Sequence, residues 1–292
     1  MTSKYQKVLV VGAGGNLARA LISLVPPRCA VVPLDHASLD ITDEDAIARA
    51  LRRHDPDIVF NGAAYNLVDE AEGEGAQASL QLNSLGPSRL AKGCEAREIP
   101  LVHFSTDFVF EGHKRTPYME TDAAVPLSVY GRTKLMGENL ISVVSPRHFI
   151  IRVCRLFGPV PADKSTQKPS GNFPLLMLNL AKERDQVRVV NDQTGSPSYT
   201  PDLARAVWQL VENGAGGLYQ LSNAGEVSFA DYARAIFEIA GVECAVEGVS
   251  SEDYGAAAQR PLYSTMSNAK AEAAGVTPLR DWREALAEFL TG

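Results

Sequence analysis

The sequence is poor in the residues that build metal centres and disulfide frameworks. Its four cysteines, Cys29, Cys94, Cys154 and Cys244, contain no Cys-x-x-Cys pair, and its five histidines lie far apart. Protein zinc sites need ligands at short, recurring spacings. The sequence therefore does not indicate a metal site, although it leaves a bridging divalent ion such as Mg²⁺ open. Scattered thiols are typical of a reducing compartment.

Excess positive charge and long apolar runs are also missing. A net charge of −7 argues against a nucleic-acid-binding surface, which needs clustered Lys and Arg. No apolar stretch reaches the roughly 18 residues of a membrane span, and the first residues lead into a strand-like run without a signal peptide. With 45% hydrophobic and 22% charged residues, the composition is that of a globular protein. We expect a cytoplasmic protein with no nucleic-acid or membrane partner.

Short apolar segments alternate with helical patterns along the 292 residues. Expected strands are 7–11, 30–34, 58–61, 101–104, 149–153, 187–190 and 217–221. Expected helices are 19–24, 43–54, 76–97 with an interruption near Gly86-Pro87, 173–183, 200–212, 228–240 and 281–290. This order predicts an α/β fold, a doubly wound parallel sheet of the Rossmann type with a smaller C-terminal substrate lobe. We assign residues 1–157 and 173–215 to an NAD(P)-binding domain, and 158–172 and 216–292 to the lobe.

A glycine-rich turn follows the first strand directly. Gly12 and Gly15 let the backbone turn tightly and approach a pyrophosphate, which can bind the amino terminus of the helix that follows. Asn16 and Leu17, between the glycines and the expected helix 19–24, are further candidates for this site. Ala18 stands where a third glycine often occurs. A purely structural turn is the alternative, but a strand before and a helix after favour a dinucleotide site.

The ends of the next two strands supply further candidates for a cofactor site. Asp35 lies 23 positions after Gly12, close to the spacing of the carboxylate that binds an adenosine ribose. The less favoured alternative is a plain strand-end residue. Small residues after the third strand would let a flat ligand lie against the backbone. The remaining candidates are Asp40, Ile41, Ala63, Ala64 and Tyr65.

Tyr130 and Lys134 are four residues apart at the start of an expected helix, so both side chains leave the same face. An ammonium near a phenol stabilises the phenolate and lowers the cost of proton release from a group with a pKa of about 10. The alternative is an ordinary helix start with an exposed lysine. One strand earlier, Ser105 and Thr106 reach the same sheet edge, where their hydroxyls can hydrogen-bond a carbonyl oxygen or satisfy turn amides.

With these motifs assembled, the chain resembles the dTDP-4-dehydrorhamnose reductase family of the extended short-chain dehydrogenase/reductases. The resemblance runs nearly end to end. Its more specific signals are Asp192-Gln193-Thr194-Gly195 and Arg260-Pro261, and it also includes Asn61-Gly62-Ala63-Ala64-Tyr65, Val68-Asp69-Glu70-Ala71-Glu72, Ser105-Thr106-Asp107-Phe108-Val109-Phe110 and Pro126 through Lys134.

The resemblance implies NADPH- or NADH-dependent reduction of the 4-keto group of a dTDP-linked 6-deoxyhexulose, giving dTDP-L-rhamnose. It implies that Tyr130 is the proton donor, that Lys134 holds the nicotinamide ribose, and that Thr106 positions the carbonyl. A nucleotide sugar is the implied substrate, and a homodimer is left open. The implied substrate-binding residues are Val68, Ser105, Thr106, Asp107, Phe108, Arg155 and Arg260.

One stretch departs from the family pattern. Where these reductases usually read Arg-Thr-Ser-Trp, this chain has Arg152-Val153-Cys154-Arg155. An aromatic that can stack on the substrate nucleotide is therefore replaced. Arg155 can substitute for it by pairing with the diphosphate or by stacking its guanidinium plane, or it is a surface arginine.

Two other functions share this fold. A nucleotide-sugar 4,6-dehydratase or epimerase is one, but related dehydratases place a Glu after a Thr-Asp pair, and here Phe108 follows Asp107. A non-catalytic regulatory subunit similar to the methionine adenosyltransferase beta subunit is the other, and it keeps the Tyr-x-x-x-Lys pair. Asp107 and the Asp192-Gln193-Thr194-Gly195 loop favour the reductase.

Overall fold

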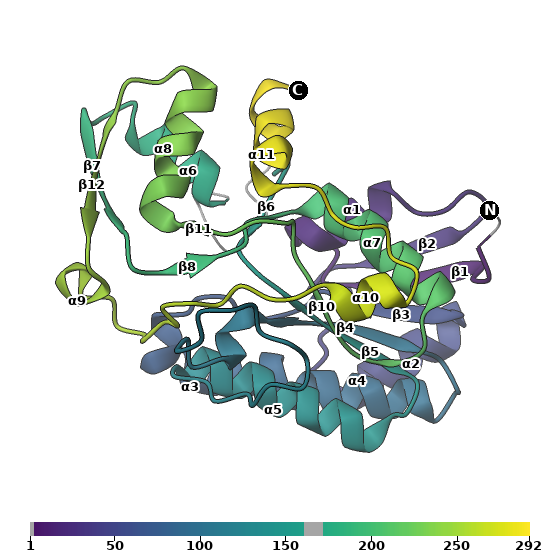
Figure 1. Ribbon diagram of the computed structural model, residues 1–292. Coiled ribbons are helices and arrows are strands. Elements are labelled where there is room, and N and C mark those ends of the chain that lie inside the picture. The colour runs from purple at the N-terminus through teal and green to yellow at the C-terminus, as the bar shows by residue number, and fades with distance from the viewer. Residues whose placement is uncertain (1–2, 161–171) are drawn as a thin grey trace.

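A six-stranded parallel sheet forms the centre of the protein (Figure 1). The computed structural model describes residues 3–160 and 172–292. The strand order β10-β5-β4-β3-β1-β2 confirms the predicted doubly wound fold, because the chain starts near the middle and builds outward in both directions. The strands are β1 (Lys7–Val11), β2 (Ala30–Leu34), β3 (Ile58–Asn61), β4 (Leu101–Thr106), β5 (His148–Val153) and β10 (Gly217–Leu221).

Both faces of the sheet are covered, which explains why its strands are apolar at successive positions. In β1, Val8 and Val10 belong to one core cluster, and Leu9 and Val11 belong to the cluster on the opposite face. Two groups of helices supply the two covers (Figure 1). One group is α1 (Asn16–Ser23) and α7 (Thr200–Asn213), and the other is α2 (Glu44–His54), α4 (Gly86–Glu95) and α5 (Val129–Val144).

The long helical region after β3 is interrupted next to Gly86-Pro87, as expected. It runs from α3 (Ala76–Leu80) through a π-helical segment η2 (Gln81–Leu85) into α4, so the irregularity comes before Gly86-Pro87. Pro87 has no N–H to donate to the carbonyl of Asn83, four residues earlier. Helix α5 crosses at this point, where a Cβ on Gly137 would lie 2.1 Å from the Asn83 carbonyl oxygen.

A smaller lobe stands over one end of the sheet, at the upper left of Figure 1. Its two-stranded sheet pairs β7 (Gln186–Val190) with β12 (Ala245–Val249) in parallel. Helices α6 (Phe173–Leu180), α8 (Phe229–Ala240) and α11 (Trp282–Thr291) pack beside it. Tyr232 of α8 lies at the centre of this core, with its ring against those of Phe157, Phe173 and Trp282.

Two short strand pairings lie between the lobe and the large sheet. β6 (Leu156–Phe157) pairs with β9 (Ser198–Tyr199), and β8 (Thr194–Gly195) pairs with β11 (Val227–Ser228). The remaining short helices are η1 (Glu70–Glu72), η3 (Asp107–Val109), α9 (Ser251–Tyr254) and α10 (Ala269–Ala273).

The elements divide between sheet and lobe differently from the residue ranges expected from the sequence. β10 was placed in the lobe, but it pairs with β5 and forms an edge of the large sheet. α6 and β7 were placed with the large domain, but they lie with α8 and β12. Strand pairing determines the place of β10 and β7, and packing on α8 determines the place of α6. The sequence does not specify these long-range contacts. The expected loop at 159–171 falls almost wholly outside the described residues. Across 3–160 and 172–292, no helix has both the length and the apolar character needed to cross a bilayer.

Candidate active site

The glycine turn between β1 and α1 forms an open cradle at the carboxyl edge of the sheet. Gly12 has a φ of +69°, and a Cβ there would lie 2.4 Å from the backbone nitrogen of Ala63. Gly15 precedes α1, and within the described chain no side chain caps the first amides of that helix. The buried Oδ1 of Asn16 also lacks a protein partner among the described residues. Free helix amides beside a close backbone approach suit a pyrophosphate.

Gly62, at the end of β3, makes room for Ala18, which stands where a third glycine often occurs. Ala18 of α1 faces Gly62, where a Cβ would lie 3.2 Å from the Ala18 Cβ. The helix can therefore approach the sheet closely although it carries a methyl group at this point. The glycine that close packing needs is supplied by the β3 end instead.

Asp35 lies at the carboxyl end of β2, as expected for a ribose-binding carboxylate, and its side chain is exposed. Its Oδ1 accepts hydrogen bonds from the backbone N–H of Ser38 at 2.9 Å and from the Ser38 hydroxyl at 2.7 Å. These bonds lower the pKa of the Asp35 carboxyl, the Ser38 hydroxyl contributing most.

The side chains of three other expected cofactor residues make contacts within the protein. Asp40 accepts from the N–H and the hydroxyl of Thr42, both at 2.8 Å, and so stabilises the loop before α2. The side chains of Leu17 and Ile41 are buried in the two core clusters of the sheet. They shape the cradle from behind and do not point into it.

Ala63, Ala64 and Tyr65 follow β3 along the same edge, and a residue that the sequence did not single out holds them there. Asn83, in the π-helical segment, accepts from the Tyr65 N–H at 2.9 Å and donates to the Tyr65 carbonyl oxygen at 3.0 Å. A buried side-chain amide thus replaces a strand neighbour for this extended backbone. The Tyr65 hydroxyl donates to Glu70 at 3.2 Å.

Tyr130 and Lys134 lie on the buried face of α5, which begins where the Ser128 hydroxyl accepts from the Gly131 N–H at 3.1 Å. Lys134 is 3% exposed, so it is not the solvated lysine of an ordinary helix start. Its Nζ donates to the Phe104 carbonyl oxygen of β4 at 2.5 Å. Burial lowers the pKa of Lys134 to about 8, while the field of Glu138 acts in the opposite direction.

The expected lowering of the Tyr130 pKa by Lys134 does not appear in the free protein. Tyr130 is enclosed by residues including Phe108, whose ring meets it edge-on at 5.6 Å, and burial raises the pKa of Tyr130 above its ordinary value. A hydrogen bond with Thr106 lowers that pKa, and the charge of Asp107 raises it. Desolvation wins because the Lys134 ammonium points to the Phe104 carbonyl.

Thr106 stands at the end of β4, where its hydroxyl makes two hydrogen bonds within the protein. Its hydroxyl donates to Asp107 Oδ1 at 3.1 Å and accepts from the Phe108 N–H at 3.2 Å. Asp107 is buried and accepts from the Cys154 thiol at 3.1 Å. Burial raises the pKa of the Asp107 carboxyl, and the Ser264 side chain, on the segment that leads back from the lobe, acts to lower that pKa.

Ser105 lies one residue away but takes no part in this arrangement. Its hydroxyl is buried and has no hydrogen-bond partner in the described parts of the chain. Alternation along β4 turns it to the opposite face of the sheet from Thr106.

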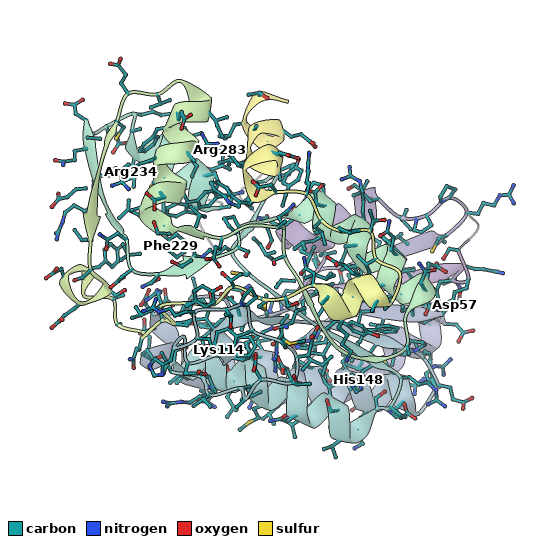
Figure 2. The ribbon with its side chains drawn as sticks, viewed as in Figure 1. Asp57, Lys114, His148, Phe229, Arg234 and Arg283 are labelled. Carbon is teal, nitrogen blue, oxygen red and sulfur yellow. The ribbon has the colours of Figure 1, made fainter. Side chains whose placement is uncertain are left out.

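The Arg155 side chain turns into the lobe, contrary to the expectation that it contacts the nucleotide. Nη1 donates to the Val227 carbonyl oxygen at 2.8 Å and Nη2 to the Gln193 carbonyl oxygen at 3.0 Å. Its guanidinium lies 3.8 Å from the ring centroid of Phe229, which Figure 2 labels at the start of α8. A Cβ on Gly195 would lie 3.0 Å from Nε, so the arginine needs a glycine beneath it. It stacks as proposed, but on the protein's own aromatic ring.

Arg260 and Val68 lie on the lobe side of the same edge. Arg260 forms a bidentate pair with Asp69, and Val68 packs against the cluster that contains Tyr65 and Tyr130. The structure thus gathers the expected residues, except the turned-away Ser105 and Arg155, along one edge of the sheet.

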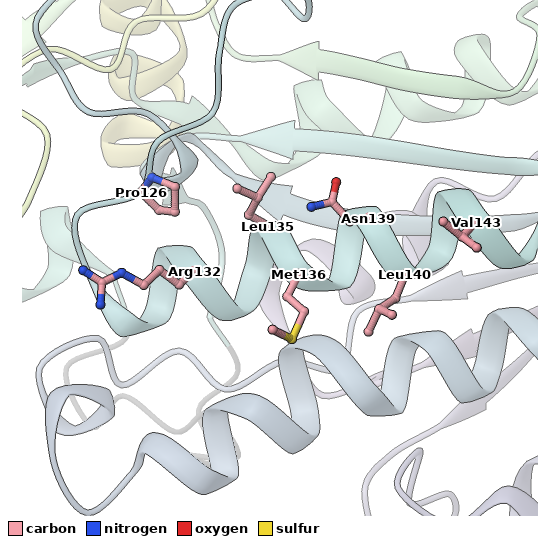
Figure 3. A pocket seen from close by; sticks show the side chains of 7 residues that line it. All are labelled: Pro126, Arg132, Leu135, Met136, Asn139, Leu140 and Val143. Carbon is pink, nitrogen blue, oxygen red and sulfur yellow. The ribbon is translucent and has the colours of Figure 1, made fainter.

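The outer face of α5 carries a separate apolar groove (Figure 3). Met136 and Val143 are exposed there, on the side of the helix away from Tyr130 and Lys134. Its lining residues are Pro126, Arg132, Leu135, Met136, Asn139, Leu140 and Val143. The groove is therefore not part of the site.

Comparisons with known proteins agree with this geometry. Residues 6–292 match the family described as RmlD substrate binding domain. The chain is 39% identical to the dTDP-4-dehydrorhamnose reductase of Mycolicibacterium smegmatis over 285 residues, covering 96% of this chain and 84% of that protein. It is also 39% identical to the spore coat polysaccharide biosynthesis protein SpsK of Bacillus subtilis, covering 97% and 96% of the two chains.

Among solved structures, the dTDP-4-dehydrorhamnose reductase of Bacillus anthracis in complex with NADP has a TM-score of 0.91 and 32% identity, covering 99% of both chains. An epimerase of Thermus thermophilus at 21% identity and a TM-score of 0.80 shares the fold. The near-complete family match and the full-length relatives confirm the resemblance read from the motifs: this chain belongs to the RmlD substrate binding domain family, among the dTDP-4-dehydrorhamnose reductases.

Proposed function

We propose that this protein is an NAD(P)H-dependent oxidoreductase that reduces the 4-keto group of dTDP-4-dehydro-L-rhamnose to give dTDP-L-rhamnose. The observation that carries the proposal is the pairing of Tyr130 with Thr106 at the carboxyl end of β4, above the buried Lys134. The phenol and the hydroxyl lie there beside the glycine cradle, and the ammonium, one helical turn along α5, is held by the Phe104 carbonyl of β4. Relatives named as dTDP-4-dehydrorhamnose reductases supply the substrate class.

The cradle residues fit a nicotinamide dinucleotide. Gly12 and Gly15 leave the α1 amides open for the pyrophosphate, and Asp35 faces the place of the adenosine ribose. Ala63 to Tyr65 give the dinucleotide a flat backbone wall. When bound, the reduced nicotinamide supplies the hydride that goes to C4 of the sugar.

Tyr130 gives the proton that the reduced oxygen needs. Its raised pKa means that Tyr130 keeps its proton at neutral pH, and so stands ready as a donor. Once the proton has passed to the sugar oxygen, the charge of Lys134 stabilises the phenolate that remains. The hydride forms the C–H bond, the Tyr130 proton forms the O–H bond, and solvent restores the proton.

Thr106 has a single proton, which it gives to Asp107 in the free protein. It can therefore donate to the Tyr130 oxygen or to the keto oxygen only after it releases Asp107.

The smaller lobe supplies the substrate contacts in this proposal, with Arg260 and Val68 at its border with the sheet. Asp107 and Phe108 line the sugar side of Tyr130. The expected assignment of 158–172 and 216–292 to the substrate becomes a proposal for the part after β10, since β10 itself belongs to the large sheet.

The test is turnover. Enzyme supplied with enzymatically generated dTDP-4-keto-6-deoxy-L-hexose should consume NADPH, seen as lost absorbance, with one dTDP-rhamnose formed per hydride. Binding of NADPH without turnover on this or any other nucleotide 4-ketosugar, together with a changed rate of a partner enzyme, would establish the regulatory-subunit alternative. Turnover confined to another nucleotide would keep the reductase and change the substrate.

A homodimer and a cytoplasmic location remain predictions. The exposed Met136 and Val143 on the outer face of α5 offer an apolar surface for a second copy. Light scattering of the wild type beside Val143→Glu tests the dimer, and cell fractionation tests the location. A monomer at micromolar concentration would rule out a stable dimer.

A further inference from the structure

A buried ion pair lies directly behind the candidate catalytic lysine. Glu138 of α5 and Arg152 of β5 bond at two points, Nε–Oε1 at 3.0 Å and Nη2–Oε2 at 2.7 Å. Their side chains are 5% and 3% exposed. The Arg152 guanidinium also lies 5.0 Å from the ring centroid of Phe110, so the pair is enclosed on several sides.

The pair continues the line of functional residues along α5. Tyr130, Lys134 and Glu138 follow at intervals of four, so they occupy one helix face. Lys134 is buried with a neutral carbonyl as its hydrogen-bond acceptor. Glu138 is therefore the carboxylate that balances its charge from the next helical turn.

A buried ion pair of this kind is weak evidence for added stability. Removing two ions from water costs several kcal/mol per ion, and apolar residues of similar volume often replace a buried pair without loss. Here the two ions are desolvated one helical turn from a buried lysine whose proposed role requires a positive charge. A retained buried pair at this place points to electrostatic support of that lysine.

We propose that Glu138, clamped by Arg152, is a positioning residue that holds the Lys134 ammonium charged and directed toward the carboxyl end of β4. The role of this positioning rests on the proposed reductase function, but the charge of Lys134 that it predicts is a property of the free protein. The titratable or charged groups around Lys134 are Tyr130 and Glu138 on its own helix, His103 on β4 and Arg152 on β5. Of these, Glu138 carries the negative charge at neutral pH. His103 is buried and stays neutral, because burial and the charge of Lys134 lower its pKa well below its ordinary value.

The direct test is a titration of Lys134 by NMR in protein labelled with ¹³Cε-lysine, with no cofactor or substrate added. The Lys134 signal is assigned by its loss in Lys134→Met. In Glu138→Gln, the midpoint should fall by about one unit or more, since an attractive charge is removed and Arg152 is left unbalanced. Glu95→Gln is the matched control, because Glu95, the last residue of α4, pairs with Arg147 and not with Arg152, and its loss should leave the midpoint unchanged.

A double variant keeps the test decisive if the single one fails to fold. Glu138→Gln combined with Arg152→Met removes both charges, and its Lys134 midpoint should still lie below that of the wild type, although by less than in Glu138→Gln alone. An unchanged midpoint in every variant that folds would overturn the proposal.

NADPH binding provides a second readout. The NADPH affinity of Glu138→Gln should be reduced more at pH 8.5 than at pH 6.5, because Lys134 with a lowered pKa loses its proton at a lower pH. A reduction by the same factor at both pH values would mean that Glu138 is merely structural. Neither measurement uses the sugar, so a failed reductase assay leaves this inference standing, and its failure leaves the reductase standing.

Discussion

Arg260 of the lobe and Asp69 of the loop after β3 face each other in a two-point ion pair, with Nη1–Oδ1 at 3.1 Å and Nη2–Oδ2 at 2.7 Å. The same Asp69 accepts from the Ala258 N–H at 3.0 Å. The Arg260 pairing contributes most to the lowered pKa of the Asp69 carboxyl. This contact joins lobe and sheet beside Val68, at the border where the sugar nucleotide is proposed to enter.

We expect Arg260→Ala to raise the KM for the sugar nucleotide at least about tenfold, with little change in NADPH affinity. An arginine that can exchange one carboxylate oxygen for a diphosphate oxygen supplies a charge-assisted bond of roughly 1.5 to 3 kcal/mol. Steady-state kinetics in both substrates measure it. Arg283→Ala, at the exposed site labelled in Figure 2, should behave as wild type. An unchanged KM would place Arg260 in interlobe packing alone.

Tyr130→Phe should lower turnover by roughly 10² to 10⁴ and leave NADPH affinity nearly intact, because it removes only the proton donor. Rapid-mixing kinetics and fluorescence titration separate the two effects. Tyr254→Phe, at an exposed tyrosine, is the control. Near-full turnover in Tyr130→Phe would end the catalytic assignment.

Lys134 should leave a signature in the pH dependence of stability. Its pKa is about 8 in the folded protein and about 10.5 when unfolded, so between these values the unfolded chain binds more protons. The free energy of unfolding therefore rises with pH across this window. From pH 7.5 to 9.5, the wild type should gain about 2 kcal/mol relative to Lys134→Met in denaturant titrations.

Taking the difference between the two proteins cancels groups common to both, including the buried thiols. Tyr130 enters only above about pH 10, since its folded pKa is raised. Parallel curves for wild type and Lys134→Met would mean that Lys134 keeps an ordinary pKa. In the same variant, turnover and NADPH affinity should both fall.

Asp35→Ala should improve the use of NADPH relative to NADH. Asp35 is exposed and charged at neutral pH, where it accepts from the ribose hydroxyls of NADH and repels the additional phosphate of NADPH. His36 beside it offsets the repulsion when protonated, so the wild type should use both cofactors. Paired titrations of kcat/KM measure the ratio, and Asp43→Ala, at the exposed cap of α2, is the control. A constant ratio would remove Asp35 from the adenosine site.

Arg155→Ala should lower the free energy of unfolding by about 2 kcal/mol, because two backbone carbonyls lose charge-assisted donors. Arg155→Lys should lose most of the same stability, since an ammonium lacks the planar fork that reaches both oxygens. Denaturant titration checks both variants. Arg234→Ala removes an exposed pair with Asp231 and should cost less than about 1 kcal/mol. A direct role in nucleotide binding would instead raise the KM without loss of stability.

Local patterns were sufficient for the sheet, the glycine cradle and the Tyr130–Lys134 pair. Strand β1 alternates between two buried faces and leads directly into Gly12, and the four-residue spacing on α5 places phenol and ammonium on one face whatever the rest of the fold does. These signals depend on neighbours in sequence. They also led to the family, which the full-length relatives confirmed.

Only the tertiary structure decided the electrostatics and the partners of each side chain. Burial, which raises the pKa of Tyr130 and lowers that of Lys134, comes from chain segments far away in sequence. The sequence left open whether Arg155 contacts the nucleotide. In the structure, its guanidinium instead contacts the Phe229 ring and two backbone carbonyl oxygens from other elements. The Glu138–Arg152 pair shows the same limit: the spacing from Lys134 is visible in the sequence, but that β5 delivers an arginine to it depends on how sheet and helix pack. Desolvation and charge pairing act through space, and the sequence alone does not specify those distances.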